Sequence, residues 1–349
     1  MAGRSTPRDL HVVLLAGGSG TRFWPQSRKR HPKQFLALSG GDLLLLETWK
    51  RVRKLVGPAK IWVVAPRPLV QKIRKALPQL RKDRLIVEPS PRDTGPAVGL
   101  ACAAVSREQA DAVVAIFPTD HVVERGDRFV TAVRRAAAEA RRGALVCLGV
   151  RPSRPATGFG YLRCARKPIG AAAVEVSRFV EKPNATRAKR FLRSGLYLWN
   201  AGMFVWKAEA FLDEMRRVAP EMERAVRQCA AGKRSRWNDA PRLSVDYAVM
   251  EKAKNVRVVP LDAGWDDVGS WDAAARLAES KGRIHGEQIK IDSADSVIFG
   301  DRRLIALIDV PGVTVVDTPD ALLVVSRESG ERVKEVVEEL KRRKREELL

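Results

Sequence analysis

Apolar and polar positions follow two different patterns along the first 150 residues. Short β-branched runs, which are typical of buried strands, lie at 11–16, 61–65, 85–88, 112–117 and 144–150. Longer amphipathic segments, which are typical of helices, lie at 43–56, 69–77, 95–107 and 128–141. Because the two kinds of segment alternate, the pattern predicts an α/β fold with a doubly wound, mostly parallel, Rossmann-like sheet. Ligands of such sheets bind outside the carboxyl ends of the strands.

A less regular pattern follows from about Pro152. Residues 174–180 and 202–206 predict antiparallel strands, and 245–253 predict a helix. Short strands are predicted further on, at 296–299, 304–308, 314–317 and 321–325, followed by a charged helix from Glu331. That helix carries an apolar stripe that needs a packing partner, formed by Val333, Val336, Val337 and Leu340. We therefore predict a large domain at 1–281 and a small β-rich C-terminal domain with a terminal helix at 282–349, without an internal repeat.

Composition favours a soluble protein of the cytoplasm. The 349 residues are 45% hydrophobic, and no apolar run approaches the roughly 18 residues of a membrane span. The first ten residues are polar and lack the apolar centre of a signal peptide. Cys102, Cys147, Cys164 and Cys229 lie far apart, so free thiols are expected rather than a disulfide framework or a metal site.

The formal net charge of +23 is the unusual feature of the composition. Basic residues are scattered along the chain, with local density at 28–33, 51–54 and 341–345, and no nucleic-acid-binding signature accompanies them. A solvated surface is the simplest interpretation, and attraction of polyanionic substrates is the alternative. Neither a nucleic acid nor a membrane is expected as a partner.

The segment from Leu14 to Pro25 is the strongest chemical signal. A strand runs into Ala16 and three glycines within five residues, which lets the backbone turn sharply and direct its N–H groups at phosphate oxygens. Arg22 and Lys33 add positive charge. The segment is neither a Walker loop nor a dinucleotide fingerprint, because Phe23 stands where the third glycine of the fingerprint belongs. A structural glycine turn is the alternative interpretation.

Two acidic residues in separate segments suggest a metal site. Asp120 ends the fourth predicted strand, and Asp267 lies between two tryptophans in the segment Gly264 to Trp271. Carboxylate oxygens at a strand end suit Mg²⁺. A turn cap for Asp120 and a packed turn for Asp267 are the alternatives.

Together these motifs resemble the sugar-nucleotide pyrophosphorylases, and within them the mannose-1-phosphate guanylyltransferases, from about residue 11 to 327. Four more segments share the resemblance: 88–97, 157–161, 179–183 and 199–204. Segments 301–306 and 315–322 favour the guanylyltransferase branch. The resemblance implies GTP and mannose-1-phosphate as substrates, GDP-mannose and pyrophosphate as products, and Mg²⁺ as cofactor.

The resemblance also assigns roles to individual residues. It implies nucleotide binding by Ala16, Gly17, Gly18, Ser19, Gly20, Thr21, Arg22, Pro89, Arg92 and Thr94. It implies sugar-phosphate binding by Gly160, Glu181, Lys182 and Asn200, and metal binding by Asp120 and Asp267. The catalytic set would be Arg22, Lys33, Asp120, Lys182 and Asp267.

Two departures from the family pattern leave alternatives open. Asp266 stands where a small hydroxyl residue is expected, and Asp93 where asparagine is common, so base preference and the number of metals stay open. Another sugar-1-phosphate nucleotidyltransferase and an inactive regulatory homologue are the rival functions, whereas an NAD-dependent oxidoreductase is disfavoured by the absent third glycine. No isomerase activity is expected, and a homodimer is one open alternative for the assembly.

Overall fold

The computed structural model describes residues 9–18, 20–38, 41–170, 172–280, 282, 286–300 and 302–349. Ser19, Lys281 and Asp301, which the sequence analysis used, lie outside the described residues. The chain forms two compact units that are discontinuous in sequence. Unit 1 comprises Met1–Gly17, Trp49–Pro118 and Val123–Trp265, and unit 2 comprises Gly18–Thr48, Thr119–Val122 and Asp266–Leu349. Each unit is described on its own below.

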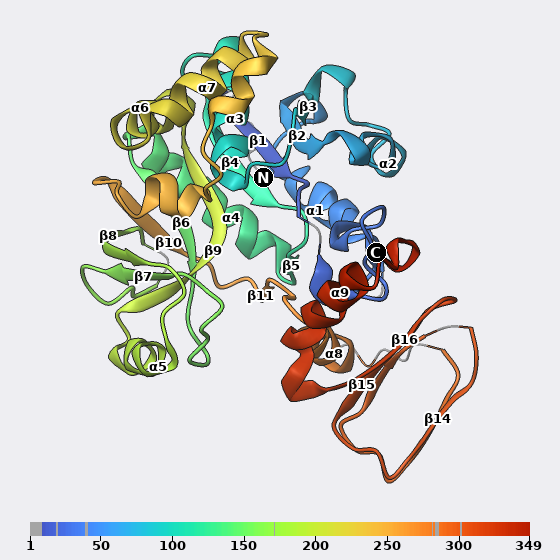
Figure 1. Ribbon diagram of the computed structural model, residues 1–349. Coiled ribbons are helices and arrows are strands. Elements are labelled where there is room, and N and C mark those ends of the chain that lie inside the picture. Colours follow the sequence, from blue (N-terminus) through green and yellow to red (C-terminus); the bar gives the residue numbers. More distant parts are fainter. Residues whose placement is uncertain are drawn as a thin grey trace, which may run out of the picture. The chain divides into compact units, whose positions relative to one another are not determined.

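Unit 1 is built on one sheet, whose nine strands within the described residues follow the order β3-β2-β1-β4-β9-β6-β10-β8-β7 (Figure 1). The strands are β1 (Leu10–Leu15), β2 (Ile61–Pro66), β3 (Leu85–Glu88), β4 (Val113–Pro118), β6 (Leu145–Val150), β7 (Tyr161–Cys164), β8 (Val174–Val180), β9 (Tyr197–Lys207) and β10 (Val256–Pro260). Two-residue strands β5 (Val122–Val123) and β11 (Trp265–Asp266) lie outside this sheet. The predicted α/β class and its first five strands are confirmed.

The sheet is more mixed than the sequence pattern predicts. Strands β3, β2, β1 and β4 are mutually parallel, as are β6 and β10. Strand β9 runs antiparallel between β4 and β6, and β8 runs antiparallel to both β7 and β10. The antiparallel strands predicted at 174–180 and 202–206 are therefore confirmed, and they make the sheet more mixed than the mostly parallel sheet predicted from the first 150 residues.

Helices cover both faces of the sheet. They are α1 (Leu44–Val52), α2 (Val70–Ala76), α3 (Thr94–Glu108), α4 (Gly126–Arg141), α5 (Ala185–Ser194), α6 (Ala208–Val218) and α7 (Pro220–Ala230). On β4, Ile116 belongs to the core shared with α3, α6 and α7, whereas the next residue, Phe117, contacts Phe129 of α4 at 5.1 Å between ring centroids. Consecutive strand residues point to opposite faces, so α4 lies across the sheet from α3. The helix predicted at 245–253 is shorter, a π-helical turn at Asp246–Met250.

Unit 2 packs around an aromatic cluster. Its elements include α8 (Trp271–Ser280), β12 (Gln288–Ile291), β13 (Val297–Phe299), β14 (Ile305–Ile308), β15 (Val313–Asp317), β16 (Leu322–Ser326) and α9 (Val333–Arg342). The indole of Trp271 contacts the rings of Phe23 and Phe299 at 5.0 and 4.9 Å. Val333 and Val337 of α9 are buried in the same cluster, so the predicted apolar stripe does have a packing partner. This core joins residues from both sides of position 281, and the domain division there stays a prediction.

The C-terminal strands contain a repeat that the sequence analysis missed. Gln288 pairs in parallel with Ile305, and Val297 with Thr314, an offset of 17 residues in both cases. The turn between the strands recurs at the same offset. Asp292 and Asp309 have φ of 48° and 55°, and Asp295 and Gly312 have φ of 56° and 66°. The expectation of no internal repeat is therefore wrong, because backbone turns recur here while most side chains do not.

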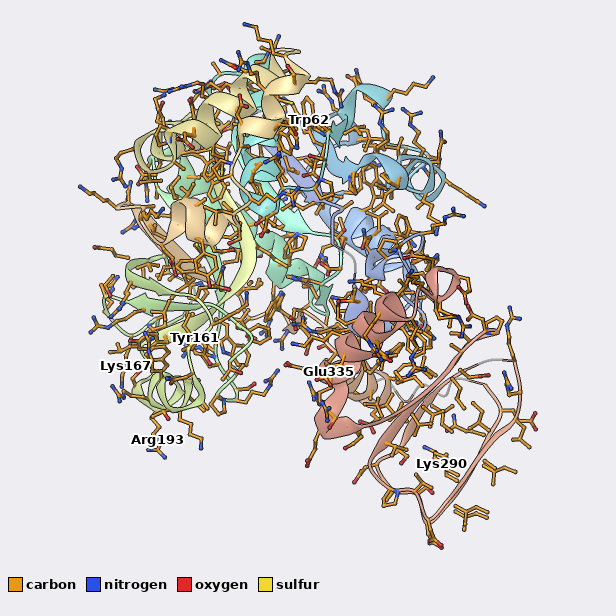
Figure 2. The ribbon with its side chains drawn as sticks, viewed as in Figure 1. Trp62, Tyr161, Lys167, Arg193, Lys290 and Glu335 are labelled. Carbon is orange, nitrogen blue, oxygen red and sulfur yellow. The ribbon has the colours of Figure 1, made fainter. Side chains whose placement is uncertain are left out.

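Charge and thiol chemistry agree with the expectations from composition. Lys167, Arg193 and Lys290 project outward from separate elements, and Tyr161 lies inside (Figure 2). All four cysteines are buried free thiols, and burial raises the pKa of Cys102 to about 12 and that of Cys164 to about 11. Among the described residues, no helix combines the length and apolarity needed to cross a membrane.

Candidate active site

The glycine-rich turn after β1 has the sharp backbone that the sequence predicts. Gly18 and Gly20 have φ of 98° and 58°, values that favour glycine. Gly20 is also needed for space, because a Cβ there would lie 2.6 Å from the Cβ of Lys33. The turn continues into a 3-10 helix at Thr21–Phe23, where the N–H of Phe23 donates to the carbonyl of Gly20 at 2.9 Å. The side chain of Arg22 is exposed at this turn.

Lys33 brings the two predicted metal ligands together within unit 2. Its side chain is 8% exposed, and Nζ lies 3.0 Å from Oδ2 of Asp120 and donates to the backbone carbonyl of Asp267 at 2.6 Å. Nζ also lies 5.6 Å from the ring centroid of Phe23. A buried ammonium needs such partners, so the cluster fixes Asp120 and the Asp267 backbone beside the glycine turn.

The carboxyl of Asp120 is held in its charged form. Burial raises its pKa, but the charges of Lys33 and His121 and the hydrogen bond from Lys33 outweigh burial, and the net pKa is lowered. Nε2 of His121 lies 3.8 Å from Oδ1 of Asp120. Asp120 is therefore ionised at neutral pH.

The segment around Asp267 is a tight turn anchored by aromatic side chains. Oδ1 of Asp266 accepts a hydrogen bond from the N–H of Val268 at 2.6 Å, which stabilises the turn where Val268 has φ of 44°. The indole N–H of Trp271 donates to the carbonyl of Trp24 at 2.9 Å. Asp266, the departure from the family pattern, thus has a structural role as a turn residue.

Two carboxylates and no richer cluster are available for a metal in this unit. Among the described residues, no group of three or more His, Cys, Asp and Glu side chains is arranged to hold a metal ion. The ionised carboxylate of Asp120 and the nearby Asp267 offer hard oxygen ligands, which suit a divalent cation that keeps water and phosphate oxygens as its other ligands. The donor set therefore fits a divalent cation.

A second group of predicted residues lies in unit 1, beginning with the loop before α3. Oδ1 of Asp93 accepts from the N–H of Thr94 at 2.7 Å and caps α3, so this segment also forms the start of that helix. Oγ1 of Thr94 accepts from the N–H of Val245 at 3.0 Å. Arg92 donates to the carbonyl of Ala240 at 2.6 Å, and Pro89 is exposed. Contacts with the chain near residue 240 therefore set the shape of this loop.

The four predicted sugar-phosphate residues form one connected cluster in unit 1. The N–H of Asn200 donates to the carbonyl of Gly160 at 2.8 Å. A Cβ on Gly160 would overlap Oε2 of Glu181, so any larger residue there would require that carboxylate to move. Nζ of Lys182 lies 3.0 Å from Oε1 of Glu181, and the lysine side chain is 58% exposed. An acid, an amide and an accessible ammonium are thus presented together.

Asp246 belongs to this cluster and was missed by the sequence analysis. Its Oδ1 accepts a hydrogen bond from Nδ2 of Asn200 at 2.8 Å. Burial and the negative charge of Glu181 raise the pKa of Asp246 to about 7, against the opposing effects of Asn200 and Lys182. Its sequence position, inside a predicted helix, gave no signal, since an acidic residue there is usually a solvated one.

Comparison with known proteins identifies the class. The model of the nucleotidyl transferase family matches residues 11–281, and that of the mannose-phosphate isomerase/GMP-like β-helix domain matches residues 286–340. Enzymes of the nucleotidyl transferase family generally use a divalent metal. The second match agrees with the parallel 17-residue repeat of β12 to β15.

Individual relatives narrow the class. The chain is 39% identical to the xanthan biosynthesis protein XanB of Xanthomonas campestris, and 37% identical to the mannose-1-phosphate guanylyltransferase of Escherichia coli. Each match covers 95% of this chain and 73% of the relative. A crystal structure from Thermus thermophilus, titled a mannose-1-phosphate geranyltransferase, matches with a TM-score of 0.88 and 33% identity over 95% of this chain and 99% of that one. The chain belongs to the mannose-1-phosphate guanylyltransferase family.

Substitution of Gly160 by alanine should impair sugar-phosphate binding. The added Cβ displaces the Glu181 carboxylate, so we expect the KM for the sugar phosphate to rise roughly tenfold or more while the KM for the nucleotide changes little. Gly158→Ala is the matched control, because no heavy atom lies within 4 Å of a Cβ there. Steady-state kinetics of both variants test this, and an equal effect of the two substitutions would contradict the assigned role of Gly160.

The raised pKa of Asp246 should appear in the pH dependence of stability. Because the pKa of Asp246 is about 7 in the folded state and 3.8 for an ordinary aspartate, the folded state holds the proton more tightly, and its stability falls as pH rises between these values. Asp246→Asn should remove this slope and gain most, relative to the parent, above pH 7. Thermal unfolding from pH 4 to pH 8 measures it, with the exposed Asp213→Asn as control. Parallel curves for the parent and Asp246→Asn would show that Asp246 ionises normally.

Proposed function

We propose that the chain transfers a guanylyl group from GTP to mannose-1-phosphate, forming GDP-mannose and pyrophosphate. The observation that carries this proposal is the buried Lys33, which joins the Asp120 carboxylate and the Asp267 backbone beside a glycine-rich turn. Such a cluster suits polyphosphate and a divalent cation. The names of relatives that are 34–39% identical supply the particular sugar and base.

The reaction requires positioning and charge neutralisation rather than a side-chain nucleophile. A phosphate oxygen of the sugar phosphate, already largely dianionic at neutral pH, attacks the α-phosphorus of GTP in line, and the bond to the β-phosphate oxygen breaks. The N–H of Ala16 already donates to the carbonyl of Val64 at 2.8 Å, so backbone N–H groups from Gly17 to Thr21, with Arg22, would hold the triphosphate. Lys33 would neutralise phosphate charge.

Asp120 and Asp267 are the residues that would hold Mg²⁺. When bound, the cation supplies charge neutralisation for the leaving pyrophosphate. In unit 1, Glu181 and Asn200 would hydrogen-bond sugar hydroxyls and Lys182 would pair with the sugar phosphate. The loop that contains Pro89, Arg92 and Thr94 would lie beside the base.

Pyrophosphate release tests this proposal directly. Four nucleoside triphosphates are each combined with mannose-1-phosphate, glucose-1-phosphate and a few relatives, with and without Mg²⁺. Fastest release with GTP and mannose-1-phosphate supports the proposal, another preferred pair would identify a different sugar-nucleotide synthesis, and no release from any pair would indicate an inactive homologue.

Homodimerisation also stays a proposal, supported by the apolar side chains that the C-terminal strands expose: Ile289, Ile291, Ile308, Leu322 and Val324.

Asp120→Asn should abolish metal-dependent turnover while leaving the fold intact. Loss of an ionised metal ligand removes several kcal/mol of transition-state stabilisation, so kcat should fall on the order of a thousandfold. Asp111→Asn, an exposed residue before the opposite end of the same strand, is the control. Turnover of Asp120→Asn close to that of the control, at any Mg²⁺ concentration, would exclude Asp120 as a metal ligand.

Lys182→Ala should raise the KM for one substrate much more than the KM for the other. Because Lys182 is assigned to the sugar phosphate, we expect its loss to raise the KM for mannose-1-phosphate roughly tenfold or more, and to change the KM for GTP much less. Lys189→Ala, which removes an exposed lysine from α5, is the control for net charge. Equal increases in both KM values would mean that Lys182 serves the nucleotide as well.

A further inference from the structure

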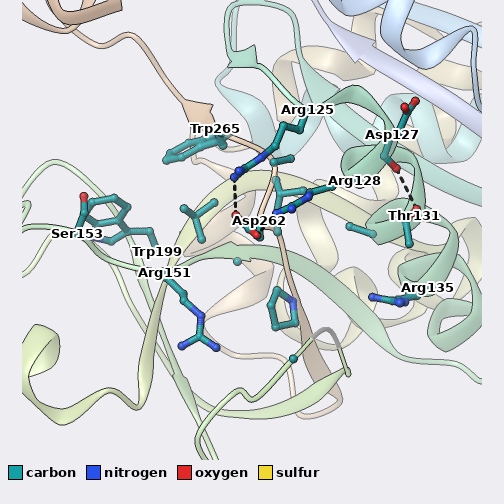
Figure 3. A pocket seen from close by; sticks show the side chains of 18 residues that line it. Arg125, Asp127, Arg128, Thr131, Arg135, Arg151, Ser153, Trp199, Asp262 and Trp265 are labelled. Atoms are coloured by element: carbon teal, nitrogen blue, oxygen red, sulfur yellow. Dashed lines mark hydrogen bonds and ion pairs between the residues drawn. The ribbon is translucent and has the colours of Figure 1, made fainter. Parts of the chain in front are cut away.

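A large cavity in unit 1 is not formed by any residue assigned to the proposed reaction. It has a volume of about 880 Å³ and lies between α4 and the carboxyl ends of β6 and β10 (Figure 3). Its lining includes Arg125, Arg128 and Arg135 from α4 and the residue before it, Arg151 after β6, and Asp262 after β10. Ligand sites for small molecules typically have volumes of about 300 to 1,000 Å³.

The cavity and the sugar-phosphate cluster lie on opposite faces of the sheet. Trp199 and Asn200 are consecutive residues of β9, so their side chains point in opposite directions. Asn200 donates to Asp246 in the sugar-phosphate cluster, whereas Trp199 lines the cavity. A ligand in the cavity would therefore be a second ligand and not a substrate in transit.

The polar lining is cationic and partly fixed in place. Four arginines face two aspartates, Asp127 and Asp262, which leaves a net formal charge of +2. Asp262 pairs with Arg125 at 2.5 Å and with Arg128, so these two guanidinium groups are held side by side. Among the described residues, Arg135 makes neither a hydrogen bond nor an ion pair. Guanidinium groups bind phosphate oxygens in pairs, and this arrangement suits two linked phosphates.

An aromatic wall completes the cavity. Trp199 and Trp265 both line it, together with the apolar side chains of Val150, Pro260 and Leu261. In Figure 3 the two indoles lie on one side of the cavity and Arg135 lies on the other. Indole faces stack on planar rings, and an apolar wall excludes water from them. Trp265 is partly exposed whereas Trp199 is 6% exposed, so Trp265 supplies most of the surface for a planar base, and the arginines supply charges for a diphosphate.

We propose that this cavity binds a nucleoside diphosphate group as a second, non-catalytic site, which goes beyond the proposed reaction. The rings of Trp199 and Trp265 lie 5.0 and 5.4 Å from that of Phe159, which immediately precedes Gly160. Gly160 in turn determines the space for Glu181. A ligand against the two indoles therefore contacts the same aromatic cluster that supports the sugar-phosphate side.

The number of GDP molecules bound per chain tests the proposal. Calorimetric titration of the intact protein with GDP, without divalent metal, is compared with titration of the double variant Arg128→Gln/Arg135→Gln. We expect the double variant to bind one GDP fewer per chain, or to bind that GDP at least tenfold more weakly, while its kcat for pyrophosphate release is unchanged. Arg134→Gln, on the same helix but outside the cavity, is the control for charge and should bind as the parent does.

A variant that should bind GDP more tightly controls for the possibility that the double variant is damaged in its fold. Asp262→Asn removes the carboxylate that competes for Arg125 and Arg128, so it should bind GDP severalfold more tightly at this site. Equal GDP binding by the parent and the double variant would overturn the proposal, and so would binding of inorganic pyrophosphate as tight as that of GDP, since the base would then go unrecognised. If the parent releases no pyrophosphate with any substrate pair but the difference of one GDP persists, the proposed reaction fails and this inference stands.

Discussion

The site in unit 2 depends on one buried charge. The ammonium of Lys33 is almost inaccessible to water, and its attraction to Asp120 and to the Asp267 carbonyl must offset the cost of leaving water. Three separate segments of the chain must therefore lie around the Nζ atom of Lys33. It also explains Gly20, because the backbone must approach Lys33 more closely than any side chain would allow. Removing the lysine would leave the partly exposed Asp120 without its main counter-charge, so electrostatics and architecture cannot be separated at this position.

Much of the fold could be predicted because apolar runs map directly onto burial. Strands β1, β2, β3, β4 and β6 and the helices between them lie within two or three residues of the predicted bounds at most of their ends. The antiparallel direction of β9 was predicted, but its place between β4 and β6 could not be, because an apolar run indicates burial and not which strands lie beside it. The C-terminal repeat could not be predicted for a different reason. Its period is carried by backbone turns with positive φ, at which aspartate and glycine substitute for each other.

The candidate site could be predicted as motifs but not as a network. Glycines, strand-end acids and lysines carry a signal in their spacing, and Lys33, Asp120 and Asp267 do lie together in unit 2. The position of Asp246 in the sequence carried no such signal, because its importance comes from the Asn200 amide and the Glu181 charge beside it. Asp266 shows the converse. It stood out as a departure from the family, yet its carboxylate stabilises a turn through the N–H of Val268, a local role that any short polar acceptor could fill.

Phe159 links the cavity on one face of the sheet with the sugar-phosphate cluster on the other face. Its ring contacts both indoles of the cavity wall, while the next residue, Gly160, lies against Glu181. If Glu181 binds the sugar phosphate as proposed, a ligand on the indoles that changes the position of this loop should change the affinity for sugar phosphate. By thermodynamic linkage, sugar phosphate must then change the affinity of the cavity for its ligand by the same factor. Both effects require that Gly160 keeps its close contact with Glu181, so Gly160→Ala would uncouple the faces without touching an arginine of the cavity.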